Sequence, residues 1–318
     1  MTPATGVAAL VTLAAATGIA FQQAAGVPVF RARADAVLVG VSVRQGDKPV
    51  AGLTVADFEV KDNEVTQTLD FVSIEPLPVD VSIVLDASFY AGAAAPRALL
   101  VIHDIAGMLR PDDRIRIIVF GNTVTTRVPY APAGAIVHAN EVAASGFRAK
   151  NEAVQFALTR PRDPERRQLV VVFTDGTRDL GSPLPSDALP SIASHSDAAM
   201  HVVLGPHDWA SQQALANAID GGTGFAAFVA RRAATNFSPE LRPLTDAAMA
   251  TGGLVYQATE TAASLSRGFQ QVFDDYLKSY LIAYVPTGVP RAGWHDLAVR
   301  VRTSKDYSVN VRRGYFGG

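Results

Sequence analysis

The sequence predicts an α/β fold: a doubly wound, mostly parallel sheet with helices on both faces, plus a small β-sandwich-like unit formed from N- and C-terminal strands. Three observations predict it. Apolar strands alternate with amphipathic helices from Val79 to Leu277. Several of these strands are continuously apolar, which is typical of strands covered on both faces. The stretches before and after this region show the period of two expected of strands, without helical periodicity.

Composition limits the function classes. The chain has 318 residues, a hydrophobic fraction of 48% and a charged fraction of 18%, which exclude a mainly disordered chain. Its net charge of −2 provides no global field to attract nucleic acid. The absence of cysteine excludes a disulfide scaffold, cysteine catalysis and a thiolate metal site.

The N-terminus resembles a signal peptide. Residues 6–21 are apolar or small apart from Thr12 and Thr17, and the small residues Ala24-Ala25-Gly26 follow. No Lys or Arg precedes this segment, so a short buried helix is the alternative. We expect residues 1–26 to be a leader and the protein to be exported to the periplasm, the cell surface or the medium. We expect no integral membrane span after leader removal, because no other segment reaches about 18 apolar residues.

Residues 30–76 predict an N-terminal β unit. Valines recur at every second position from Val37 to Val43, as in a half-buried strand. Further strands are expected at 57–60 and 68–74, separated by a polar turn at 61–64. Prolines at 76 and 78 then mark a boundary.

Residues 79–278 predict the α/β domain. Its first strand ends in Asp86, Pro96 suits the first turn of the following helix, and threonines in 123–128 indicate an edge strand. A long irregular insertion is expected at 206–240. Strands are expected at 79–85, 115–120, 123–128, 168–174, 200–204 and 254–256, and helices beginning near 96 and at 141–156, 186–194, 241–250 and 262–277.

Residues 279–318 return to strand patterns, at 280–285, 296–301 and 307–311. Each terminal β piece is too small to bury a core alone. We therefore expect the two pieces to pair into one unit, with the α/β domain inserted between them.

Two predicted strands end in aspartate, at Asp86 and Asp175. In open parallel sheets, ligands bind beyond the carboxyl ends of the strands. The Ser88 hydroxyl, two residues after Asp86, adds another oxygen. Such an oxygen-only set suits Mg²⁺.

At these residues the chain resembles the von Willebrand factor type A domain family, over roughly Val79 to Lys278. The resemblance rests on Val81–Ser88, on 109–114 leading into 115–120, and on Val170–Gly176. The flanking segments 57–60, 280–286 and 313–316 resemble the VWFA-related exported proteins of acidobacteria. The resemblance implies a type A fold and a role in binding other proteins.

The family's metal-ion-dependent adhesion site uses Asp-x-Ser-x-Ser, a threonine from a second loop and an aspartate from a third. Asp86, Ser88 and Asp175 match the first aspartate, the first serine and the third-loop aspartate. Tyr90 stands where the second serine belongs. The second loop reads Ser145-Gly146-Phe147-Arg148 and has no threonine.

The resemblance therefore implies a degenerate site at which Mg²⁺ binding is weak or absent. In the alternative interpretation, Asp86 and Asp175 cap loops and helix N-termini, and Asp86 pairs with Arg148 without metal. Either way, the expected binding face around these aspartates comprises Tyr90, Phe147, Arg148, Thr174 and Gly176.

Other patterns are weaker. His195, His201 and His207 do not share one helix or strand face, so exposed or capping histidines are expected rather than a shared metal. Ser88, His103 and Asp104 lack the elbow motif of a hydrolase. The mixed-charge run at 160–167 indicates a solvated loop.

The sequence thus predicts an exported, non-enzymatic module that mediates protein–protein interaction or adhesion with a protein partner. The alternative is a structural or assembly scaffold of the cell envelope whose type A loops bind nothing.

Overall fold

The computed structural model describes residues 35–46, 48–74, 77–87, 95–133, 149–161, 163, 165–176, 182–205, 241–258, 262–302 and 307–317. Contacts group Ala34–Gly318 into one unit. The domain boundaries expected near 76–79 and 278–279 stay a prediction. In the described part of the chain, no helix is both long and apolar enough to span a bilayer.

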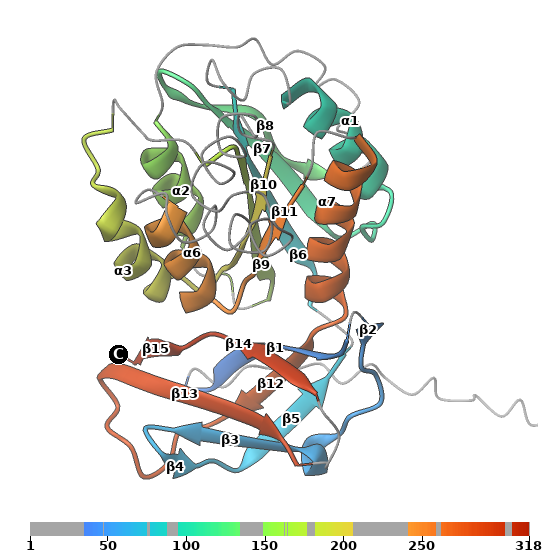
Figure 1. Ribbon diagram of the computed structural model, residues 1–318. Helices are drawn as coiled ribbons and strands as arrows, with labels where there is room; N and C mark the ends of the chain where they lie inside the picture. The colour runs from blue at the N-terminus through green and yellow to red at the C-terminus, as the bar shows by residue number, and fades with distance from the viewer. Residues whose placement is uncertain are drawn as a thin grey trace, which may run out of the picture. The chain divides into compact units, whose positions relative to one another are not determined.

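A six-stranded sheet forms the centre of the α/β part, in the order β11-β10-β9-β6-β7-β8 (Figure 1). Its strands pair in parallel, except that β8 runs antiparallel to β7 at one edge. This order confirms the mostly parallel sheet and the edge position of the threonine-containing strand. The strands are β6 (Val79–Asp86), β7 (Arg114–Phe120), β8 (Val124–Pro132), β9 (Arg167–Thr174), β10 (Ala199–Leu204) and β11 (Val255–Gln257).

Helices cover both faces of this sheet, as predicted (Figure 1). Alternate residues of the buried strands serve the two faces: Ile83 and Leu85 pack in the cluster with α1 and α7, whereas Val84 packs with the other helices. The continuous apolar runs are therefore explained by burial on both sides. The helices are α1 (Ala95–Ala106), α2 (Lys150–Leu158), α3 (Leu189–Ser194) after the short turn η3 (Ser186–Ala188), α6 (Leu241–Ala250) and α7 (Ala262–Leu277).

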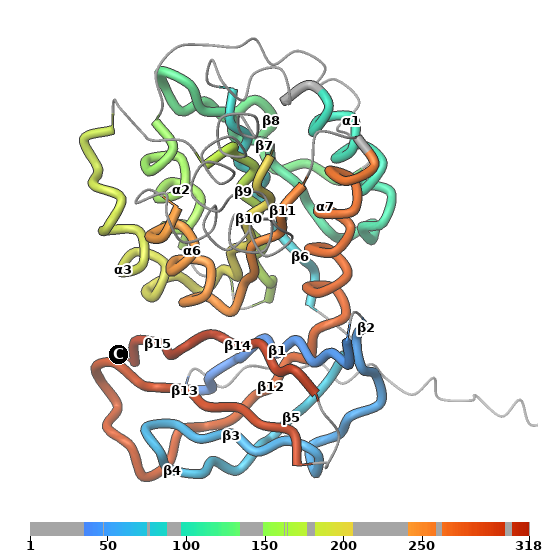
Figure 2. The backbone as a smooth tube through the Cα atoms, viewed as in Figure 1, coloured from blue at the N-terminus to red at the C-terminus, as the bar shows by residue number. Residues whose placement is uncertain are grey.

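Strands from the two ends of the chain pair in the β part (Figure 2). One sheet has the order β14-β1-β12-β5, with β2 beside β1, and the other has the order β15-β13-β3-β4. Val39 and Ile282 face each other across β1 and β12 in a core shared by both sheets. The elements are β1 (Val37–Gln45), β2 (Lys48–Pro49), η1 (Val55–Asp57), β3 (Phe58–Asp62), β4 (Val65–Thr66), β5 (Leu69–Ser73), β12 (Tyr280–Tyr284), β13 (Gly293–Val301), β14 (Ser308–Val311) and β15 (Gly314–Gly317).

The turn predicted at 61–64 is shorter in the structure. Lys61 and Asp62 belong to β3, and only Asn63 and Glu64 turn the chain, with φ of 44° and 65°. Two consecutive residues with positive φ are what a tight two-residue hairpin requires. The short strands β2 and β4 and the C-terminal β15 were not predicted, because they are too short to show periodicity.

The mixed-charge run at 160–167 was predicted to be a solvated loop, and the structure agrees only in part: Pro161 and Glu165 are exposed, whereas three arginines of the run have partners inside the protein. Asp80, at the start of β6, is fully buried and accepts hydrogen bonds from Arg114 (Nε, 2.8 Å), Arg166 (Nε, 2.6 Å) and Arg160. Arg167, the last residue of the run, is itself buried as the first residue of β9. Arg160 and Arg166 thus neutralise a carboxylate that lies far away in the sequence.

Asp80 is ionised in this setting. Burial by itself would raise the pKa of the Asp80 carboxyl, but the hydrogen bonds from Arg114, Arg160 and Arg166 outweigh burial and lower the pKa to about 2. The ring of Tyr130 on β8 lies against three guanidinium groups, 4.4 Å from that of Arg160, 4.7 Å from that of Arg116 and 5.5 Å from that of Arg114. The amino end of the central strand is thus closed by a packed ionic cluster.

We expect Asp80→Asn to lower the free energy of unfolding by about 3 kcal/mol at neutral pH, because three guanidinium groups lose their buried counter-charge. A carboxyl whose pKa is lowered on folding stabilises the protein above its unfolded pKa, about 3.9, and loses that contribution as the pH falls toward its folded pKa of about 2. Urea denaturation should therefore show the difference between wild type and variant shrinking over this acidic range.

The control for this prediction is Glu59→Gln, which alters the exposed pair between Glu59 and Arg300 and should change stability little. An equal loss of stability in Asp80→Asn and Glu59→Gln, or a loss that is independent of pH, would contradict the assignment.

Candidate functional site

The predicted site lies at the carboxyl ends of β6 and β9, which are neighbours in the sheet. Asp86 ends β6 and is fully buried, and the Thr174 hydroxyl at the end of β9 donates a hydrogen bond of 2.6 Å to Asp86 Oδ2. The two strands pair up to Leu85 and Phe173, so their register places these two polar side chains together. The Asp86 carboxylate is therefore held by a neighbouring strand.

The two described residues after β9, Asp175 and Gly176, lie next to Thr174 at the end of that strand. The Thr174 hydroxyl oxygen accepts a hydrogen bond from the Gly176 backbone N–H (3.2 Å), and the Thr174 carbonyl accepts one from the Gly205 N–H (2.8 Å). Gly176 has a φ of +76°, and a Cβ there would lie 2.5 Å from Leu241 Cδ2. Only glycine suits both this backbone conformation and this close approach.

Asp175 lies between these residues and is 6% exposed. The structure thus brings Asp86, Thr174, Asp175 and Gly176 to one edge of the sheet. Thr174 was predicted to contribute to a binding face, but its side chain is fully buried and positions Asp86 instead. The other predicted site residues, which are Ser88, Tyr90, Phe147 and Arg148, lie outside the described residues.

The oxygen atoms of the described residues do not complete the coordination shell of a magnesium ion. Mg²⁺ prefers six oxygen ligands in near-octahedral geometry. Here the carboxylates of Asp86 and Asp175 are the acidic groups at the site, and the Thr174 hydroxyl already gives its proton to Asp86 and accepts from Gly176. Among the residues that the structure describes, no group of three or more His, Cys, Asp or Glu side chains could hold a metal ion. Weak or absent Mg²⁺ binding stays a prediction.

Of His195, His201 and His207, the structure describes two: His195 is exposed and caps the end of α3, as predicted, whereas His201 departs from the prediction. His201 is buried on β10, where burial lowers the pKa of its imidazole to about 4, and its Nδ1 accepts a hydrogen bond from the Leu254 N–H (3.2 Å). His195 stacks on the ring of Phe316 at 3.8 Å. His201 is thus an uncharged core residue rather than an exposed or capping one, and His207 lies outside the described residues.

A second polar cluster, inside the β part, was missed by sequence reasoning. The buried carboxylate of Asp62 binds His295 Nδ1 (2.7 Å) and accepts hydrogen bonds from the hydroxyls of Tyr284 (2.9 Å) and Tyr315 (2.7 Å). Burial is the main factor that raises the pKa of both tyrosines well above the usual range, so both remain neutral donors. The sequence did contain one indication of this cluster. Asp62 follows Phe58 and Val60 at a spacing of two, so its side chain is expected to point inward with theirs.

No protein-family model and no curated protein matches this sequence. Among solved structures, the chain is similar to an aerotolerance-related membrane protein from Bacteroides fragilis, at 18% identity and a TM-score of 0.40, over 61% of this chain and 98% of that one. It is similar to a manganese-loaded TRAP protein from Plasmodium vivax, at 12% identity and a TM-score of 0.40, over 81% and 98%.

The chain is also similar to a von Willebrand factor type A protein from Catenulispora acidiphila, at 13% identity and a TM-score of 0.42, over 87% of this chain and 73% of that one. Similarities of this size carry no conclusion about function. The α/β fold class rests on the strand order and helix placement described above.

We expect Thr174→Val to lower the free energy of unfolding by about 2 kcal/mol, because the buried Asp86 carboxylate loses its hydroxyl donor. Thr174→Ser keeps the hydroxyl and should retain most of the stability. Denaturant unfolding of both variants is the measurement. Unchanged stability of Thr174→Val, or a larger loss in Thr174→Ser than in Thr174→Val, would contradict the role assigned to this hydrogen bond.

Proposed function

We propose that this protein is an exported, non-enzymatic binding module that presents the edge around Asp86 and Asp175 to a protein partner, with little or no dependence on metal. The observation that carries the proposal is the hydrogen bond from Thr174 to the fully buried Asp86. This bond gives Asp86 Oδ2 a partner within the protein itself, which supports recognition with little dependence on a cation. The proposal of export rests on the apolar segment at 6–21.

The position of this edge supports recognition there. In open α/β sheets the carboxyl ends of the strands are where loops gather and ligands bind. The two described residues that follow β9 are Asp175 and Gly176, and the Gly176 N–H donates a hydrogen bond to the Thr174 hydroxyl oxygen.

A scaffold without ligand binding is the second candidate, and one observation favours it. The described residues at this edge are mostly buried, since Asp86, Ala87, Thr174 and Asp175 all have little exposed surface. A protein-binding face would then depend on the loops that extend beyond these residues.

We expect titration calorimetry of the purified protein to give a Kd for Mg²⁺ and Mn²⁺ weaker than about 10 μM, which corresponds to less than about 7 kcal/mol of binding free energy. The reason is the small number of direct protein oxygens. Asp175→Asn removes one of them and serves as the matched variant. Tighter binding by the wild type that Asp175→Asn abolishes would overturn the proposed metal independence.

Partner capture separates the binding module from the scaffold. Tagged protein incubated with envelope extract should retain the same partner with and without a chelator, and Asp175→Arg should reduce retention because it places a bulky cation at the proposed face. Retention that is unaffected by Asp175→Arg would place recognition elsewhere. Mass spectrometry of the mature N-terminus tests export.

A further inference from the structure

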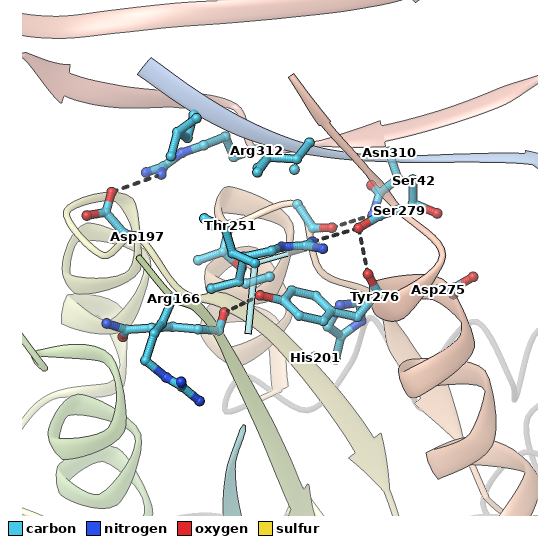
Figure 3. Close-up of a pocket in the computed structure, with 18 of the residues that line it drawn as sticks. Ser42, Arg166, Asp197, His201, Thr251, Asp275, Tyr276, Ser279, Asn310 and Arg312 are labelled. Atoms are coloured by element: carbon cyan, nitrogen blue, oxygen red, sulfur yellow. Dashed lines mark hydrogen bonds and ion pairs between the residues drawn. The ribbon is translucent and has the colours of Figure 1, made fainter. Parts of the chain in front are cut away.

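A cavity of about 100 Å³ lies where the β part meets the base of the central sheet (Figure 3). One wall is the outer face of β1, with Leu38, Gly40 and Ser42. These residues alternate with Val39, Val41 and Val43, which face the core of the β part. The opposite wall comes from the starts of β9 and β10 and from the end of α7.

Most charges around this cavity are paired. Asp275 forms an ion pair with Arg44, and Arg166 binds Asp80. Arg312 lies 3.7 Å from Asp197 and also donates hydrogen bonds to the carbonyls of Ser194 and Ser196. His201 lines the cavity too, but burial lowers its pKa to about 4, so it adds no charge near neutral pH.

Arg167 differs from these residues. It lines the cavity, is 8% exposed, donates a hydrogen bond from Nη2 to the Ser279 hydroxyl (2.7 Å) and lies 4.2 Å from the centre of the Tyr276 ring. Its Nη1 is buried, with no hydrogen-bond partner among the described residues. No ion pair joins Arg167 to a carboxylate in the described part of the chain. A hydroxyl and an aromatic face only partly compensate a buried guanidinium.

We propose that this cavity binds a small monovalent oxyanion, such as the carboxylate of a small organic acid, with Arg167 as the cation that recognises it. A carboxylate accepts hydrogen bonds from a guanidinium and supplies the missing counter-charge. The Ser42 hydroxyl on the opposite wall provides a further polar group.

The size and charge of the cavity define the ligand class. A volume of about 100 Å³ is well above the space that one water molecule needs and far below the roughly 300–1,000 Å³ of pockets for drug-sized ligands. Asp163 and Asp197 also line the cavity, and their charge repels multiply charged anions. A small monoanion is the class that satisfies both conditions.

The probe for the test is sodium acetate, compared with sodium chloride at equal ionic strength in thermal unfolding. Acetate at about twenty times its Kd should raise the Tm of the wild type by roughly 3 °C relative to chloride. Arg167→Met should abolish the difference. It should also fold, because replacing a buried charge by an apolar side chain of similar volume is often neutral or stabilising.

Two further variants complete the test. Ser42→Leu fills the cavity from β1 without removing the described bonds of Arg167, and it should also lose the acetate response; it decides the outcome if Arg167→Met does not fold. Arg300→Met removes a guanidinium that is 71% exposed and does not line the cavity, and it should respond like the wild type. No acetate-specific shift in the wild type, or an equal shift in Arg167→Met or Ser42→Leu, overturns the proposal and indicates that water alone hydrates Arg167.

Discussion

The complete burial of β6 is the constraint on which the rest of the structure depends. All eight of its residues are buried, and two of them are aspartates: Asp80 near its amino end and Asp86 at its carboxyl end. A buried carboxylate is tolerated only when donors surround it. At the amino end, arginines from β7 and from the segment before β9 supply these donors, and at the carboxyl end Thr174 does. Polar contacts to these two aspartates, as well as apolar packing, thus determine which segments lie beside β6.

The periodicity of the sequence predicted individual strands, but it did not predict ion pairs between residues that are far apart along the chain. The alternating valines of β1 and the apolar run of β9 each carry their own signal, so both strands were predicted within two residues of their observed bounds. Arg160 and Arg166 bind Asp80, which lies 80 and 86 positions away along the chain, so their role is visible only in the folded structure. The segment was therefore read as a solvated loop, because nothing in its local pattern announces a buried partner.

In the candidate site, too, the sequence predicted some residues and not the contacts between them. Asp86 and Asp175 could be predicted because each follows a recognisable strand, and parallel strands bring their ends to one edge. The role of Thr174 could not, because the register of β6 and β9 decides whether its hydroxyl reaches Asp86. In the β part, Asp62 meets Tyr284 and Tyr315 from strands 222 and 253 positions away, so its partners become visible only after the sheets pair.

β9 connects the two proposed sites, because Arg167 begins it and Thr174 ends it. Seven steps of about 3.3 Å separate these residues by roughly 23 Å. An anion bound at Arg167 is therefore too far away to contact the Asp86 edge. The strand between them is buried throughout and packs on both faces. An anion at Arg167 would therefore stabilise the junction with the β part while leaving the Asp86 edge available to a partner, and the two sites are expected to act independently.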